Sequence, residues 1–111
     1  MESVIAQRDV EVETNNELVP GNIQVFAPQL HTQERPKADY WGCRVAVNFG
    51  SYTRSREIFG EDSFQALLLA LKMVPTEIEF SPAFRNGKLR LWGNPLTSTS
   101  EVFDWKPRGE A

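Results

Sequence analysis

The sequence has little of what catalytic and metal sites are made from. Its 111 residues include one cysteine, Cys43, and one histidine, His31. A structural zinc site needs about four ligands, usually several Cys and His, and a nucleophilic triad needs a positioned base. No phosphate-binding glycine loop occurs. We therefore expect no metal, no cofactor and no enzymatic activity, with Cys43 as a packed thiol and His31 as a solvated side chain.

Targeting and membrane signals are also missing. The start, MESVIAQRDVEVE, lacks the basic stretch and apolar run of a signal peptide. The longest apolar run, residues 66–71, is far too short to cross a bilayer. The net charge of −3 gives no steering toward nucleic acid or anionic lipid. These absences predict a soluble, cytoplasmic protein without a membrane partner, and they make nucleic-acid binding an unfavoured hypothesis.

The composition is that of an ordinary globular domain. Hydrophobic residues make up 41% of the chain and charged residues 24%. We expect one domain over residues 1–96, followed by a tail over residues 97–111 that holds Phe103 and Trp105. The tail is too apolar to extend freely into water. It either folds back onto the domain or binds a partner.

Alternation predicts two strands near the N-terminus. Val10 and Val12 alternate with glutamates, which is typical of a half-buried strand over residues 4–14. The pair Asn15-Asn16 predicts a turn. Pro20-Gly21 predicts another turn before a second strand over residues 23–27. Residues 28–39 are polar, with two prolines and no period, and we expect a mobile surface loop there.

The clearest strand covers residues 41–49, and residues 52–59 form its predicted hairpin partner. The register of this hairpin has two alternatives. A two-residue loop at Gly50-Ser51 would place Arg54 and Arg56 opposite buried valines. A three-residue loop would turn both arginines toward water. Because an unpaired buried arginine is costly, we favour the three-residue loop.

Residues 62–74 predict a capped and almost wholly apolar helix. Asp62 is a good N-cap, and Gln65 follows at the third helical position of a capping box. Helical spacing places one apolar stripe on the face we expect to meet the sheet: Phe64, Leu67, Leu68, Leu71 and Val74. A second apolar face consists of Ala66, Leu69, Ala70 and Met73. Pro75 is expected to end the helix.

One short strand and a hairpin are expected after the helix. Ile78 and Phe80 alternate with glutamates, which predicts a strand. Asn86-Gly87 is a type I′ hairpin signal between Ala83-Phe84 and residues 89–92. The fold class is therefore α+β: an antiparallel sheet of about five strands with one main helix packed on one face.

Two surfaces are candidates for interaction. Exposed aromatic and apolar side chains are typical of protein interfaces. The first candidate surface consists of Leu69, Met73, Trp92, Phe103 and Trp105. The second is a basic patch on adjacent strands, formed by Arg44, Arg54 and Arg56. A basic patch beside aromatics is compatible with single-stranded nucleic acid, but solvated hairpin charges explain it equally well.

Part of the chain resembles a known family. The segment from Phe59 to Lys72 (FGEDSFQALLLALK) resembles a helix signature in small bacterial proteins described only as a domain of unknown function. The segments 41–43 and 87–93 resemble the strands that flank it there. The resemblance implies a bacterial or phage origin and brings no activity.

Three functions remain, in this order. The first is a non-catalytic protein that binds another protein, such as an accessory or immunity-type inhibitor. The second is a homo-oligomer, for example a homodimer, joined through the outer face of the helix. The third is a weak nucleic-acid-binding module or an enzyme, which would need a deep pocket holding His31 and a carboxylate.

Overall fold

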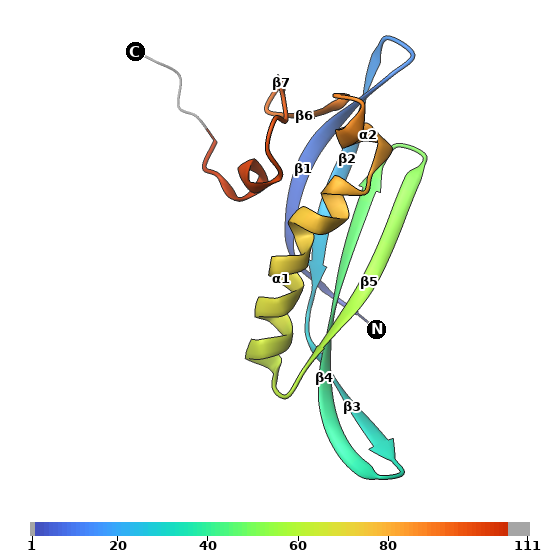
Figure 1. The fold of residues 1–111 in the computed structure, drawn as a ribbon, viewed down its shortest axis with the longest axis vertical. Coiled ribbons are helices and arrows are strands. Elements are labelled where there is room, and N and C mark those ends of the chain that lie inside the picture. Colours follow the sequence, from blue (N-terminus) through green and yellow to red (C-terminus); the bar gives the residue numbers. More distant parts are fainter. Residues whose placement is uncertain (1, 107–111) are drawn as a thin grey trace.

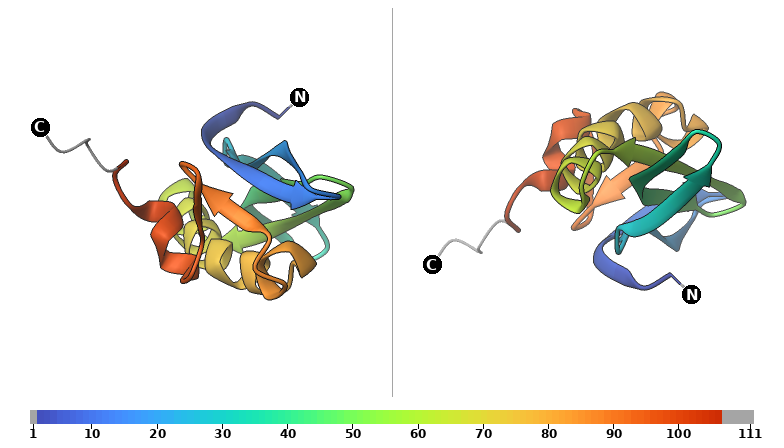
Figure 2. Two further views of the ribbon diagram at one scale, coloured as in Figure 1. Left: turned by 90° about the horizontal axis from the view of Figure 1, so that it is seen from above. Right: turned by 90° about the horizontal axis from the view of Figure 1, so that it is seen from below.

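The computed structural model describes residues 2–106. It shows one antiparallel seven-stranded sheet with a single long helix against one face (Figure 1), which confirms the predicted α+β class. Seen end-on, the helices lie on one side of the sheet (Figure 2). The molecule measures 54 × 34 × 23 Å. Its elements are β1 (Val4–Thr14), β2 (Glu17–Phe26), β3 (Gln29–Glu34), β4 (Lys37–Phe49), β5 (Tyr52–Gly60), α1 (Ser63–Glu79), α2 (Pro82–Arg85), β6 (Leu89–Leu91), β7 (Asn94–Pro95) and the 3-10 helix η1 (Thr99–Phe103).

The hairpin of β1 and β2 forms largely as the alternation predicts. Val10 and Val12 are buried, and Asn15 and Asn16 make the turn, both with positive φ. The predicted turn at Pro20-Gly21 is wrong, because β2 runs through it. Pairing of β2 with β4 begins only at Gly21, so the missing N–H of Pro20 costs no ladder hydrogen bond.

The predicted loop over residues 28–39 is also wrong. β3 and the start of β4 occupy it as a hairpin that extends past the helix (Figure 1). β2 and β3 pair with successive parts of β4, from Val25 opposite Val45 to Gln29 opposite Gly42. Most side chains of this hairpin are exposed on both faces, so it carries no apolar alternation that a sequence pattern could reveal.

The register of the β4–β5 hairpin is the alternative we did not favour. Phe49 pairs with Tyr52 across a two-residue loop, so Arg54 lies opposite Val47 and Arg56 opposite Val45, on the face that carries the helix. Arg54 Nε lies 3.2 Å from one carboxylate oxygen of Glu77, and Arg56 Nε lies 3.8 Å from the other. The arginines are therefore paired, which removes the objection to this register.

The helix begins as predicted but faces the sheet differently. The Asp62 carboxylate accepts the backbone N–H of Gln65 at 2.7 Å. The fully buried apolar face consists of Ala66, Ala70, Val74 and Ile78. This is mainly the predicted outer face, while Phe64 and Leu68 of the predicted core stripe are exposed. The small side chains allow close approach: a Cβ at Gly60 would lie 2.6 Å from the backbone nitrogen of Ala66.

The helix does not end at Pro75 but continues to Glu79. Pro75 is only partly buried, and it lies on the same side of the helix as Leu71, four residues earlier. Because proline has no N–H, the Leu71 carbonyl lacks its intrahelical donor. The strand expected at Ile78 and Phe80 is therefore wrong. The segment that begins at Pro82 is the short helix α2, so the hairpin expected at Asn86-Gly87 does not form.

Glu77 should contribute strongly to stability. The residue is 1% exposed, and the structure gives its carboxylate oxygens only the two arginines as partners within residues 2–106. We expect Glu77→Gln to lower the free energy of unfolding by about 2 kcal/mol, less than for a fully buried pair because both arginines reach solvent. Urea unfolding measures this. Glu79→Gln, an exposed change on the same helix, is the control and should cost less than about 0.5 kcal/mol. Equal losses would contradict the assignment.

Candidate functional site

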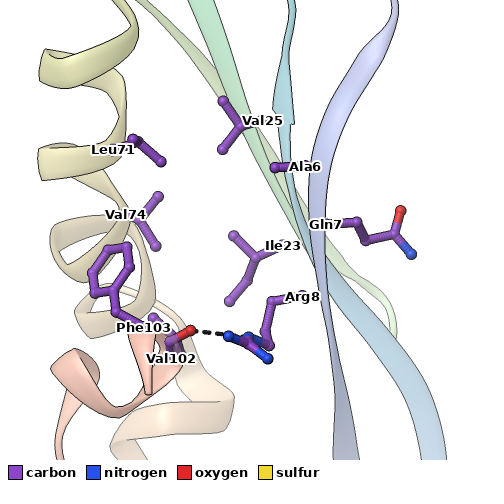
Figure 3. A pocket seen from close by; sticks show the side chains of 9 residues that line it. All are labelled: Ala6, Gln7, Arg8, Ile23, Val25, Leu71, Val74, Val102 and Phe103. Atoms are coloured by element: carbon purple, nitrogen blue, oxygen red, sulfur yellow. Dashed lines mark hydrogen bonds between the residues drawn. The ribbon is translucent and has the colours of Figure 1, made fainter. Parts of the chain in front are cut away.

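The helix covers only part of the sheet face on which it lies. α1 packs mainly on β4 and β5, and a groove of about 310 Å³ runs between α1 and the inward side chains of β1 and β2. Ala6, Ile23 and Val25 form its floor, and Leu71 and Val74 form the wall on α1 (Figure 3). This apolar groove, called the α1–β1 groove below, is the candidate functional site.

The tail closes one end of the α1–β1 groove. Val102 is buried and Phe103 lines the groove beside it. The Arg8 guanidinium reaches the tail from β1, where its Nε donates to the Val102 carbonyl at 3.0 Å (Figure 3). Its Nη2 donates to the Asp104 carbonyl, also at 3.0 Å. The guanidinium also lies 5.1 Å from the centroid of the Trp92 ring, which is a cation–π contact. Two charge-assisted hydrogen bonds and this contact therefore hold Arg8 in place.

Glu101 shapes the tail segment that carries Val102. Its carboxylate accepts the backbone N–H of Ser98 at 2.8 Å and that of Thr97 at 2.7 Å. The hydrogen bond from Ser98, followed by the one from Thr97, lowers the pKa of the Glu101 carboxyl. The charged form that these bonds favour fixes the turn that leads into η1.

Large apolar side chains are exposed along the same flank of the helix. Phe64 is 75% exposed and Leu68 is 41% exposed. Residues spaced by four and three on a helix share one side, so both lie in line with Leu71, which is in the groove wall. Phe103 is 51% exposed at the groove end. Exposed aromatic and aliphatic side chains beside a groove are typical anchors of protein interfaces.

β1 has an open edge beside the α1–β1 groove. On the side away from β2, β6 pairs only with Glu11 and Val12. The chain then turns away at Trp92 and Gly93, with φ of 53° and 82°, and returns as β7. Within residues 2–106, no strand pairs with that edge of β1 before Glu11.

The five predicted interaction residues do not form one surface. Trp92 and Phe103 lie around Arg8 at the groove end. Leu69 lines a different hollow with Tyr40 and Phe59, and Met73 is half-buried. The 89% exposed Trp105 covers neither face of the helix. Of the predicted tail, residues 107–111 lie outside the described residues.

The residues of the groove floor were missed by the sequence reasoning. Ala6 and Arg8 belong to a stretch of β1 without clear alternation, and Ile23 and Val25 were predicted only as part of a strand over residues 23–27. One signal was present: the helix carries more large apolar side chains than a single sheet face covers. That excess indicated an uncovered surface but not its place.

The three arginines of the predicted basic patch lie on two opposite faces of the sheet. Arg54 and Arg56 are on the helix side with Glu77. Arg44 is on the back face, where its Nε donates to the Glu2 carboxylate at 2.8 Å. The hydrogen bond with Glu2 is the main cause that raises the pKa of Arg44. Each guanidinium thus has a carboxylate neighbour, and the structure does not bring the three together.

His31 is not a solvated loop residue, since it lies on β3 with its Nε2 2.7 Å from a carboxylate oxygen of Glu57. The imidazole also stacks on Tyr40, with ring centroids 5.2 Å apart. This pair lies on the open back face of the sheet, with 33% and 24% of the two side chains exposed. Among the described residues, no group of three or more Cys, His, Asp or Glu side chains is placed to hold a metal.

Comparison with known proteins identifies the family. The chain belongs to the family described as Domain of unknown function (DUF6968), whose model matches residues 6–99. The match includes β1 from Ala6 onward, β2 and α1, but it ends before Val102 and Phe103. No curated protein and no solved structure matches the chain. No helix in residues 2–106 combines the length and apolarity that a membrane crossing requires.

Cys43 should make stability depend on pH in the alkaline range. Its thiol is fully buried and donates to the Phe26 carbonyl at 3.2 Å. Burial, followed by the carboxylates of Glu2 and Glu57, raises its pKa. A raised folded pKa stabilises the protein below the unfolded value of about 8.5, and this contribution falls as pH rises from there through the folded pKa.

We therefore expect the stability difference between the wild type and Cys43→Ala to shrink as pH rises above about 8.5. Urea unfolding of both proteins from pH 7 to pH 10 measures this difference. The other titrating groups are the same in both proteins, so their contributions cancel when the two free energies of unfolding are subtracted. A difference that stays constant over this range would contradict the burial argument.

Proposed function

We propose that this protein is a non-catalytic binding module that docks another protein in the α1–β1 groove. The observation that carries the proposal is the apolar groove together with the exposed flank of α1 beside it. Aromatic and aliphatic side chains around a pocket are the usual anchors of protein interfaces. An accessory or immunity-type inhibitor role fits this surface and the small size of the chain.

We propose that the protein acts in the cytoplasm of a bacterium and that it is encoded either by the bacterium or by a phage that infects it. The resemblance of residues 59–72 to small bacterial proteins supports the source. The single cysteine supports the compartment, because a free buried thiol fits reducing conditions. Both statements are independent of the groove and can fail without it.

Self-association is the alternative use of the same flank. A second copy would bury Phe64 and Leu68, which are the large exposed side chains on the outer side of α1. The predicted homodimer through Ala66 and Ala70 is no longer part of this alternative, because both side chains are buried against the sheet.

Site-specific photocrosslinking in cells of the source organism tests the proposal. A benzophenone amino acid at position 68 should crosslink to a different protein. The same probe at position 30, an exposed leucine on β3, is the matched control and should not capture that protein. A crosslink to a second copy of the chain would support self-association, and no crosslink above the control would contradict both.

Phe64→Ser with Leu68→Ser should weaken the captured complex by more than about tenfold, since it removes two exposed apolar anchors. Titration of the purified partner against both proteins measures the change. The folded state should be unaffected, because both side chains are mostly outside the core, and an unchanged urea midpoint is the control. Unchanged affinity would exclude this flank as the interface.

A further inference from the structure

We propose that the partner contributes an extended strand that pairs with the open edge of β1. Apolar side chains of that strand would enter the α1–β1 groove, and basic side chains would lie on the opposite face. This inference rests on the proposed function and specifies the chemistry of its partner.

The backbone of β1 has hydrogen-bonding groups directed to the open edge. The N–H of Glu13 donates to the Lys88 carbonyl at 2.8 Å, so the backbone groups of Glu13 point toward β6. These groups alternate along a strand, and those of Glu11, Asp9 and Gln7 therefore point the same way. Glu11 meets Arg90 of β6. In the described part of the chain, Gln7 and Asp9 have no strand opposite them on that side.

An added strand would lie along β1 beyond the point where β6 stops pairing with it. In the β1–β6 register, a longer β6 would place residue 92 opposite Asp9 and residue 94 opposite Gln7. The turn at Trp92 and Gly93 instead directs the chain into β7. An extended segment of another protein can occupy this line, which is the usual geometry of β-strand addition.

Side-chain alternation on β1 gives the added strand two different faces. Ala6 and Arg8 point into the groove, and Gln7 points to the other side of the sheet (Figure 3). Alternate residues of a neighbouring strand therefore face the groove, where Leu71 and Phe103 favour apolar side chains. Arg8 needs no partner from the added strand, because two tail carbonyls already accept its hydrogen bonds.

The back face beside β1 is acidic. Asp9 is exposed there, and within residues 2–106 its carboxylate accepts only a neutral hydrogen bond, from Gln7 Nε2 at 2.7 Å. Glu11 and Glu13 follow on the same face of the strand, but Glu13 is paired with Arg90 and Lys88, and Glu11 accepts the backbone N–H of Gly93 at 3.0 Å. Asp9 is therefore the carboxylate that faces the open part of the edge. Opposite charges on neighbouring strands attract and like charges repel. A strand with basic residues on this face is therefore complementary to β1.

A second copy of β1 fits this edge less well. Antiparallel pairing centred on Arg8 would set two guanidinium groups opposite each other, and pairing centred on Asp9 would set two carboxylates opposite each other. Pairing centred on Gln7 would place Asp9 opposite Ile5. None of these registers supplies apolar residues to the groove and basic residues to the back face, so we assign the edge to a different protein.

The test uses the full chain and two capped heptapeptides, one alternating lysine with valine and one alternating glutamate with valine. The lysine peptide should slow hydrogen exchange of the Gln7 and Asp9 amides, measured by NMR. The glutamate peptide should bind about fivefold more weakly for each lost charge pair. A lysine peptide N-methylated on alternate residues, which cannot complete the ladder, should bind more than about tenfold more weakly.

Two variants separate the charge effect from the backbone effect. Asp9→Lys should reverse the preference between the two peptides, while Glu17→Lys, a charge change at the distant β1–β2 turn, should not. Gln7→Pro removes one N–H directed to the open edge and should abolish peptide binding. If it fails to fold, the N-methylated lysine peptide still tests the backbone contribution, and Asp9→Lys tests the charge.

The outcomes keep this inference apart from the proposed function. Partner capture at position 68 without exchange protection at Gln7 and Asp9 by any peptide would overturn strand addition and leave the docking groove standing. Exchange protection of both amides that rises with protein concentration in the absence of peptide would identify a second copy as the occupant and overturn the assignment to a different protein.

Discussion

The buried carboxylate of Glu77 is the constraint on which the rest of the structure depends. A carboxylate that is 1% exposed needs cationic neighbours, and Arg54 and Arg56 supply them from the facing strand. The pair fixes the register of β5 against β4, because a one-residue shift would turn both arginines to the other face. It also holds the end of α1 over β5, past Pro75. The helix therefore packs on β4 and β5, and the face of β1 and β2 beside it is left uncovered as the α1–β1 groove.

The parts of the fold that sequence reasoning predicted depend on local patterns. The alternation around Val10, the asparagine turn and the Asp62 cap each involve a few neighbouring residues. The β4–β5 register was predicted wrongly because the residue that compensates its arginines lies in α1, which no local pattern connects to the hairpin. β3 was missed because solvent lies on both of its sides. In both cases the deciding interaction is absent from the segment itself.

The helix face shows how hydrophobicity and packing can differ. A stripe of large apolar residues predicts a core, but close contact with a sheet favours small ones. Ala66 and Ala70 are both fully buried against the sheet, and the helix backbone at Ala66 lies so near Gly60 that even one added carbon would collide. The larger Phe64 and Leu68 are then displaced to the flank. The groove itself could not have been predicted, because β1, α1 and η1 meet there only in the folded chain.

The family match divides the α1–β1 groove into two parts. Residues 6–99 include the open edge of β1, the floor and the wall on α1, while the closing residues Val102 and Phe103 lie beyond the match. Arg8 joins the two parts, since it belongs to β1 and donates to the carbonyl of Val102. The open edge of β1 offers backbone hydrogen-bonding groups, which can pair with a strand of almost any sequence. The closed end of the groove instead selects a side chain by its shape. Strand addition would therefore supply affinity that depends little on side chains, and the tail held by Arg8 would determine which side chain fits the end of the groove.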